Sequence, residues 1–304
     1  MKKIAYIAGA LMLLFPALAG AQALSYTAAE TDAASLGTAG ANLVQTGTIA
    51  NAAFSNAAVI PFSDQKFDAS AGYTMWQPQS IGSNMINIGA AYNMKEKFGL
   101  ALGIMYGMNP AYDITDAAGA AKGQFSPSDM SINAGLAYRF LPYLSIGANV
   151  GYASSTLAEG YSYGALVADV FAMAKFSGIK VTAGVANIGT SVKSKNGTSF
   201  GLPASFALGA GYEADFAQKH SVEVLLDADY YFSGGFAAAA GASYTYGHMV
   251  AVRAGYRYGG NSPLPSYASI GAGVIFKGAK IDLAYLLASG PMKNTLALSL
   301  GYTF

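Results

Sequence analysis

The sequence predicts an all-β protein: a transmembrane antiparallel β-barrel of about 14 strands with an N-terminal plug segment. Three observations lead to this prediction. The chain starts like an exported protein, apolar and polar residues alternate along most of it, and the connections between the alternating segments are long and short by turns. Together these properties are typical of barrels in the bacterial outer membrane.

The first 21 residues have the three parts of a secretory signal peptide. Lys2 and Lys3 give a positive start, an apolar run follows over residues 4–18, and residues 19–21 form a small-residue cleavage site. We therefore expect residues 1–21 to be removed on export and the mature chain to begin at Gln22. Beyond Gln22 there is no run of about 18 apolar residues, so the sequence predicts no membrane-spanning helix.

The composition is unusual for a soluble protein. Only 11% of the residues are charged, against about 25% in ordinary globular proteins. A soluble domain must cover its surface with charge, whereas a barrel in lipid presents apolar and aromatic side chains outward. The chain contains no cysteine, so disulfides do not stabilise it. It also carries no phosphate-binding loop, dinucleotide fingerprint or basic nucleic-acid patch, and we expect no nucleic-acid partner.

Strict alternation predicts the strands, because successive side chains of a strand point to opposite faces. In residues 295–304 apolar residues occupy every second position and small or polar residues occupy the others. In several segments the face opposite the apolar one carries charge, and in a membrane barrel that face lines the lumen. The charged residues that we expect to face the lumen are Arg139, Asp169, Glu223, Asp227, Asp229, Arg253, Arg257, Lys280 and Asp282.

Connection lengths distinguish a barrel from a soluble sandwich. The sequence contains fourteen candidate strands, at 66–76, 84–94, 97–107, 128–140, 143–153, 163–176, 179–188, 203–214, 219–230, 235–246, 249–258, 267–276, 279–288 and 294–304. Connections after odd-numbered strands are mostly the longer ones, and those after even-numbered strands are mostly tight turns. Outer-membrane barrels have long loops outside and short periplasmic turns. We therefore predict domains of 1–21 (signal peptide), 22–64 (plug) and 65–304 (barrel).

Residues 22–64 lack the period of two and are rich in Ala, Gly, Thr and Asn. One interpretation is a plug or hatch folded inside the barrel, and the other is a partly disordered periplasmic leader. Apolar residues such as Leu36, Ile49 and Phe54 are interspersed through the segment and favour the plug, because a solvated tail would not need them.

Two stretches of this segment resemble a known family. Residues 33–41 (Ala-Ala-Ser-Leu-Gly-Thr-Ala-Gly-Ala) and 53–58 (Ala-Phe-Ser-Asn-Ala-Ala) resemble the N-terminal signature of the PorV/PorQ family, a glycine-rich stretch followed by Asn-Pro-Ala. Shorter matches are found at 124–129, 185–189, 253–256 and 281–285. The resemblance implies a barrel related to the FadL fatty-acid channel, with fourteen strands and a hatch, and it marks Gly37, Gly40 and Asn56 as a plug motif. Ala57 stands where the signature has proline, so the residue that would make a rigid hatch turn at this point is missing.

The resemblance implies two functions for a protein of the bacterial outer membrane. One is a role like that in type IX secretion, in which the barrel binds or anchors exported or surface-anchored proteins. The alternative is a FadL-like channel for uptake of hydrophobic small molecules. The outer loops are small and lightly charged and lack an apolar collar, which favours protein contacts. Outer-membrane lipid is the other expected partner.

We expect no enzymatic activity. Residues 197–201 match the G-x-S-x-G pattern but lie between two strands, whereas a nucleophile elbow needs a strand-to-helix turn and a His–acid pair. No catalytic, cofactor-binding or metal-binding set is expected. The lumen charges carry a different hypothesis: Arg253 and Arg257 pair with Glu223, Asp227 and Asp229 in a network that holds the plug or closes the pore.

Overall fold

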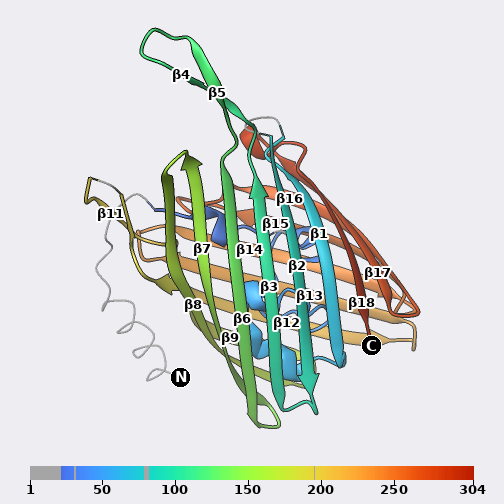
Figure 1. Cartoon of the computed structure of the whole chain (residues 1–304). Helices are drawn as coiled ribbons and strands as arrows, with labels where there is room; N and C mark the ends of the chain where they lie inside the picture. Colours follow the sequence, from blue (N-terminus) through green and yellow to red (C-terminus); the bar gives the residue numbers. More distant parts are fainter. Residues whose placement is uncertain (1–21, 31, 79–81, 195) are drawn as a thin grey trace.

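Fourteen antiparallel strands close into one barrel in the computed structural model, which describes residues 22–30, 32–78, 82–194 and 196–304 (Figure 1). Neighbouring strands in the barrel follow one another along the chain, and the last strand pairs with the first. This arrangement confirms the predicted fold class. The barrel strands are β1 (Phe67–Trp76), β2 (Ser83–Met94), β3 (Phe98–Met108), β6 (Ser128–Leu141), β7 (Leu144–Ala158), β8 (Tyr161–Phe176), β9 (Ile179–Gly189), β12 (Ser205–Phe216), β13 (His220–Tyr231), β14 (Phe236–Tyr246), β15 (Val250–Tyr258), β16 (Tyr267–Phe276), β17 (Ala279–Ala288) and β18 (Leu296–Thr303).

The predicted signal peptide, residues 1–21, lies outside the described residues. Within the described ranges, no helix is long and apolar enough to cross a bilayer.

Tight turns join the strands at one end of the barrel. Both central residues have positive φ at Lys95–Glu96, Ser177–Gly178, Ala217–Gln218, Gly247–His248 and Lys277–Gly278. This backbone matches the type I′ hairpin turn, whose twist follows that of the strands. The connection at 215–218, expected to be longer, is one of these tight turns because β12 continues to Phe216.

The long connections at the opposite end contain structure that the sequence did not predict. β4 (Tyr112–Thr115) pairs with β5 (Ala121–Phe125), and β10 (Val192–Lys193) pairs with β11 (Ser199–Phe200). Figure 1 shows the β4–β5 hairpin projecting well beyond the rim. The long loops therefore lie together at the end that would face outward in an outer membrane.

The two faces of the wall differ as the alternation predicts. In β18, Leu300 is 52% exposed on the outside whereas Ser299 is 3% exposed on the inside. Large apolar side chains cover the outer face of the other barrel strands in the same way, among them Leu102, Leu136 and Ile270. Such a surface suits lipid, because the exposure of a continuous apolar belt to water is unfavourable.

The N-terminal segment (residues 22–64) lies inside the ring of strands, visible as short blue helices in Figure 1. Its elements are η1 (Ser25–Ala28), α2 (Ala33–Gly37), η2 (Ala52–Phe54) and η3 (Ala57–Phe62); a further turn, η4 (Gly290–Met292), lies between β17 and β18. Helix α2 contacts β15 to β18, and η3 contacts β3, β6, β7 and β8 on another part of the wall. The segment therefore touches strands from both halves of the barrel sequence.

Glycines on the inner wall let the segment approach closely. Gly241 and Gly255 are cross-strand neighbours in β14 and β15. A Cβ on either would come within 2.6 Å of backbone or side-chain atoms of Thr38. The wall therefore has a shallow seat for the end of α2 that no larger residue could leave open.

Candidate functional site: the lumen and its cavity

Two carboxylates of the wall hold the N-terminal segment by its backbone. Asp227 Oδ2 accepts hydrogen bonds from the N–H groups of Asn42 and Leu43, at 2.7 and 3.0 Å. Asp68 Oδ2 accepts from Ile49 and Ala50, at 2.9 and 3.1 Å. Each carboxylate therefore satisfies two consecutive amides that have left regular structure, and charge-assisted bonds of this type are stronger than neutral ones.

Asn56 links two parts of the N-terminal segment, the start of η3 and the backbone at Leu43. Its Oδ1 accepts from the Ala58 N–H at 2.9 Å and thereby caps η3, while its Nδ2 donates to the Leu43 carbonyl at 2.7 Å. The side chain is fully buried. A defined 3₁₀ turn is thus present after Asn56 although Ala57 replaces the proline of the family signature.

The other plug-motif residues are glycines packed against wall and segment. The Gly37 carbonyl accepts a hydrogen bond from Ser269 Oγ at 3.1 Å. Gly40 has φ 79°, a left-handed conformation that ends α2, and its N–H donates to the Ser35 carbonyl at 2.9 Å. A Cβ at Gly40 would lie 3.2 Å from Glu30 Cγ.

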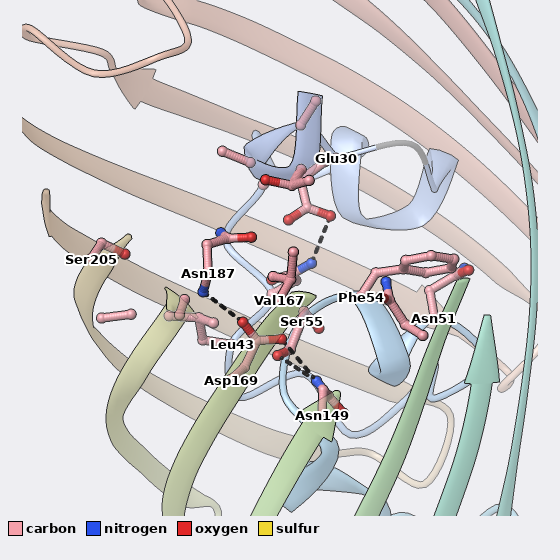
Figure 2. A pocket seen from close by; sticks show the side chains of 18 of the residues that line it. Glu30, Leu43, Asn51, Phe54, Ser55, Asn149, Val167, Asp169, Asn187 and Ser205 are labelled. Carbon is pink, nitrogen blue, oxygen red and sulfur yellow. Dashed lines mark hydrogen bonds between the residues drawn. The ribbon is translucent and has the colours of Figure 1, made fainter. Parts of the chain in front are cut away.

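A cavity of about 100 Å³ lies between the N-terminal segment and the wall, towards the long-loop end (Figure 2). Its apolar lining includes Leu43, Phe54, Met105, Val167, Phe171 and Tyr231. Figure 2 shows Glu30 reaching into this space from the N-terminal segment and Asp169 reaching into it from β8. The cavity thus combines aromatic and aliphatic walls with carboxylates that enter from several sides.

Carboxylates outnumber basic groups among the described residues that line this cavity. The carboxylates are those of Glu30, Asp32, Asp169, Asp227 and Asp229, and Arg257 is the one basic residue in this described lining. The Arg257 Nη2 lies 3.7 Å from Asp229 Oδ2 and donates to the Tyr231 hydroxyl at 3.4 Å.

The other carboxylates of the cavity have neutral hydrogen-bond donors. Asp169 accepts from the Asn187 N–H at 2.7 Å and from Asn149 Nδ2 at 3.3 Å. Asp32 accepts from the Ser35 N–H at 3.0 Å and caps α2, and Glu30 accepts from Asn42 Nδ2 at 2.9 Å. Neutral donors satisfy the oxygens without cancelling the charge.

The pKa of Glu30 reflects its burial among other carboxylates. Burial, together with the neighbouring Asp32 carboxylate, raises the pKa of Glu30 from its ordinary 4.5 to about 8, and Arg257 only partly opposes the shift. A carboxyl whose pKa rises this far lies in a site short of positive charge.

The predicted ion-pair network has different partners from those expected. Only Arg257 and Asp229 pair as predicted. Arg253 Nη1 lies 2.7 Å from Asp282 Oδ1, and Glu223 pairs with the buried Lys180, which also contacts Glu213. Among the described residues no cation pairs with Asp227, which binds backbone amides instead. Strand register does not decide these partners, because Arg253 is level with Glu223 through Ser243. Lys180, which was not in the predicted set, pairs with Glu223 instead.

Lys280 and Arg139 complete the predicted set. Lys280 forms a buried ion pair with Asp68. Arg139 lies near the tight-turn end, where it donates to the Pro61 carbonyl at 3.1 Å and contacts Glu96 at 3.2 Å. Both residues therefore face the lumen side, and both touch groups that hold or border the N-terminal segment.

Four residues of the site were not predicted: Glu30, Asp32, Asp68 and Lys180. The first two lie in the segment without a period, so no face could be assigned to them. Asp68 and Lys180 do alternate with outward residues of their strands, and this pattern was the available evidence for an inward position.

Further cavities follow the first one along the lumen. A space of about 20 Å³ within the N-terminal segment shares Asp32, Asn42, Asn51 and Ser55 with the first cavity. It shares Gln45 and Thr48 with a third cavity of about 290 Å³ near the tight turns. The three spaces thus form a series along the lumen, and the smallest of them lies within the N-terminal segment.

No protein-family model and no curated protein matches the sequence. The structure is similar to the toluene transporter TodX of P. putida (TM-score 0.61, 14% identity, 90% of this chain and 98% of that chain). It is also similar to the toluene transporter TbuX of Ralstonia pickettii (0.60, 12% identity, 90% and 97%) and to a Pseudomonas aeruginosa FadL homologue (0.57, 12% identity, 94% and 100%). The chain therefore has the fold of FadL-like outer-membrane barrels. With its apolar outer belt, this fold places the protein in the bacterial outer membrane.

Proposed function

We propose that this protein is an outer-membrane channel that takes up small, largely hydrophobic molecules, with residues 22–64 as its hatch. The observation that carries the proposal is the series of three cavities, which runs through the lumen and narrows at the N-terminal segment. The aromatic and aliphatic lining of the first cavity suits an apolar ligand of modest size. The similar structures named above are transporters of toluene and a FadL homologue, and they support the same function.

The alternative, a PorV/PorQ-type protein that binds or anchors exported proteins, has weaker support. It rests on the short motifs in the N-terminal segment and on the loops, and none of the three similar structures above is a secretion component. The channels among the similar structures also agree with a protein that is not an enzyme.

Uptake by whole cells tests the proposal. Cells that carry the protein should accumulate a radiolabelled monoaromatic hydrocarbon faster than cells that carry an empty vector. Ala207→Trp fills the first cavity and should abolish the gain, because Ala207 is buried in its lining. Leu208→Trp, on the outer face of the same strand, is the matched control and should keep it. Uptake equal to the vector's, with specific surface proteins captured by crosslinking, would instead favour the anchoring role.

A further inference from the structure

The outer face of the barrel combines aromatic rings with lysines at the tight-turn end. We propose that this surface binds the headgroups of anionic phospholipids in the periplasmic leaflet, chiefly through Lys97 and Lys277. The observation that carries the proposal is the position of these two ammonium groups, each of which lies over an aromatic ring on the outside of the wall. This surface is outside the lumen, so its partner does not depend on the molecule that the channel carries.

Aromatic side chains on the outer face mark the height of the periplasmic membrane interface. Six strands each contribute one exposed ring close to a tight turn or to the end of the chain, namely Phe98, Tyr138, Phe176, Phe216, Phe276 and Tyr302. In outer-membrane barrels such rings lie between the apolar band and water, at the level of the lipid headgroups. A charged group beside these rings is therefore at headgroup level too.

Two lysines place their ammonium groups beside these rings. Lys97 Nζ lies 5.6 Å from the centroid of the Tyr138 ring, and Lys277 Nζ lies 5.5 Å from the centroid of the Phe276 ring. The ring face attracts the cation, and the long lysine chain can cover apolar surface while its charged end stays in the polar layer. Both ammonium groups therefore lie where the phosphates of a surrounding bilayer are found.

The carboxylates near these turns do not neutralise the two lysines. Glu96 contacts Arg139 at 3.2 Å, and Asp215 lies on the lumen face of β12, because the next residue, Phe216, points outward. Within the described parts of the chain, no carboxylate is at ion-pair distance from Lys97 or Lys277. Both lysines are therefore available to an external anion.

The charge of the turns also differs from that of the long connections. Lys95 and Lys219 are exposed at two of the tight turns and add to the positive charge there. The described residues of the long connections include lysines and carboxylates in equal number, namely Lys122, Lys193, Lys293, Asp113, Asp116 and Glu159. Basic residues close to a membrane surface attract anionic lipids. We therefore expect the preference for anionic lipid in the periplasmic leaflet.

Spin-labelled lipids test this inference on the full-length purified protein in phosphatidylcholine vesicles. Electron spin resonance measures how strongly spin-labelled phosphatidylglycerol and spin-labelled phosphatidylcholine associate with the barrel. At low salt phosphatidylglycerol should associate at least about twofold more strongly. The preference should decline in 1 M NaCl, where the screening length is about 3 Å. The double variant Lys97→Gln/Lys277→Gln should lose most of the preference, and each single variant should lose part of it.

A matched double variant controls for the loss of two positive charges. Lys122→Gln/Lys193→Gln changes two exposed lysines of the long connections and should keep the preference. Equal association of the two lipids with the native protein overturns the inference, and so does a preference that the Lys97/Lys277 variant retains. A preference that only the control variant loses would place the lipid contact at the outer rim and would overturn it as well. Heat-modified migration on gels checks that each variant forms the barrel, and the single variants decide if the double variant does not.

Discussion

Lys280 on β17 and Asp68 on β1 form a buried ion pair across β18, the strand that lies between them. Gly301 of β18 makes room for this crossing, because a Cβ there would lie 3.1 Å from Lys280 Cε. The pair therefore spans the seam at which the last strand closes on the first. Asp68 also accepts hydrogen bonds from the Ile49 and Ala50 amides of the N-terminal segment. One carboxylate therefore stabilises both the seam of the barrel and the position of this segment.

Asp68→Asn should destabilise the barrel by about 3–5 kcal/mol, because it leaves the Lys280 ammonium buried without a counter-charge. Asn can still accept from the Ile49 and Ala50 amides, so the hatch contact itself persists. Urea-induced unfolding of the protein in lipid vesicles measures the loss. The double variant Asp68→Asn/Lys280→Met should recover much of it, and a double variant as unstable as the single one would contradict this explanation.

The hatch should loosen as the pH rises. The raised pKa of Glu30, about 8 against an ordinary 4.5, means that the folded site favours the neutral carboxyl. The stabilisation is complete below about pH 4.5 and is lost as the pH rises through 8. The charged groups that act on Glu30 are Asp32 on its own segment, Arg257 on β15, and Asp227 and Asp229 on β13.

Hydrogen exchange of residues 32–44, corrected for the intrinsic effect of pH, checks this dependence. Protection should fall between about pH 5 and 8 in the native protein, and the fall should be smaller in Glu30→Gln. An equal fall in both proteins would assign the effect to other groups.

Gly241→Ala should displace the end of α2 from the wall. The new Cβ would lie 2.6 Å from Thr38 atoms, and overpacking of this kind costs about 1–3 kcal/mol. We expect faster hydrogen exchange at residues 33–41 and a higher single-channel conductance in planar bilayers. Gly201→Ala is the matched control, because a Cβ at Gly201 meets nothing within 4 Å.

Asn56→Ala should weaken the hatch without affecting the barrel. It removes the cap of η3 and leaves the Leu43 carbonyl without its donor, at a cost of about 1–3 kcal/mol. Limited proteolysis should cut residues 42–62 earlier than in the native protein, while heat-modified migration on gels, which reports on the barrel, stays the same. Protease resistance equal to the native protein's would argue that Asn56 has no anchoring role.

The wall was predictable because its rules are local. A period of two separates Leu300 from Ser299 without knowledge of any partner strand, and turn lengths count the strands. Partners within the lumen were harder to predict, because each depends on every other charge nearby, such as Lys180 beside Glu223. Arg253 meets Asp282 rather than Glu223, although both acids were expected to face inward. The cavity was beyond sequence reasoning, since Glu30 belongs to a segment whose shape is set by the wall around it.

The position of residues 22–64 in the chain has a consequence for assembly. β1 and β18 are joined by contacts between residues 236 positions apart, such as Thr303 and Phe67, and closing so long a loop is entropically costly and slow. The N-terminal segment contacts β3 and β6 to β8 as well as β15 to β18. Contacts of one short segment with both halves of the ring shorten the loop that the last closure has to span.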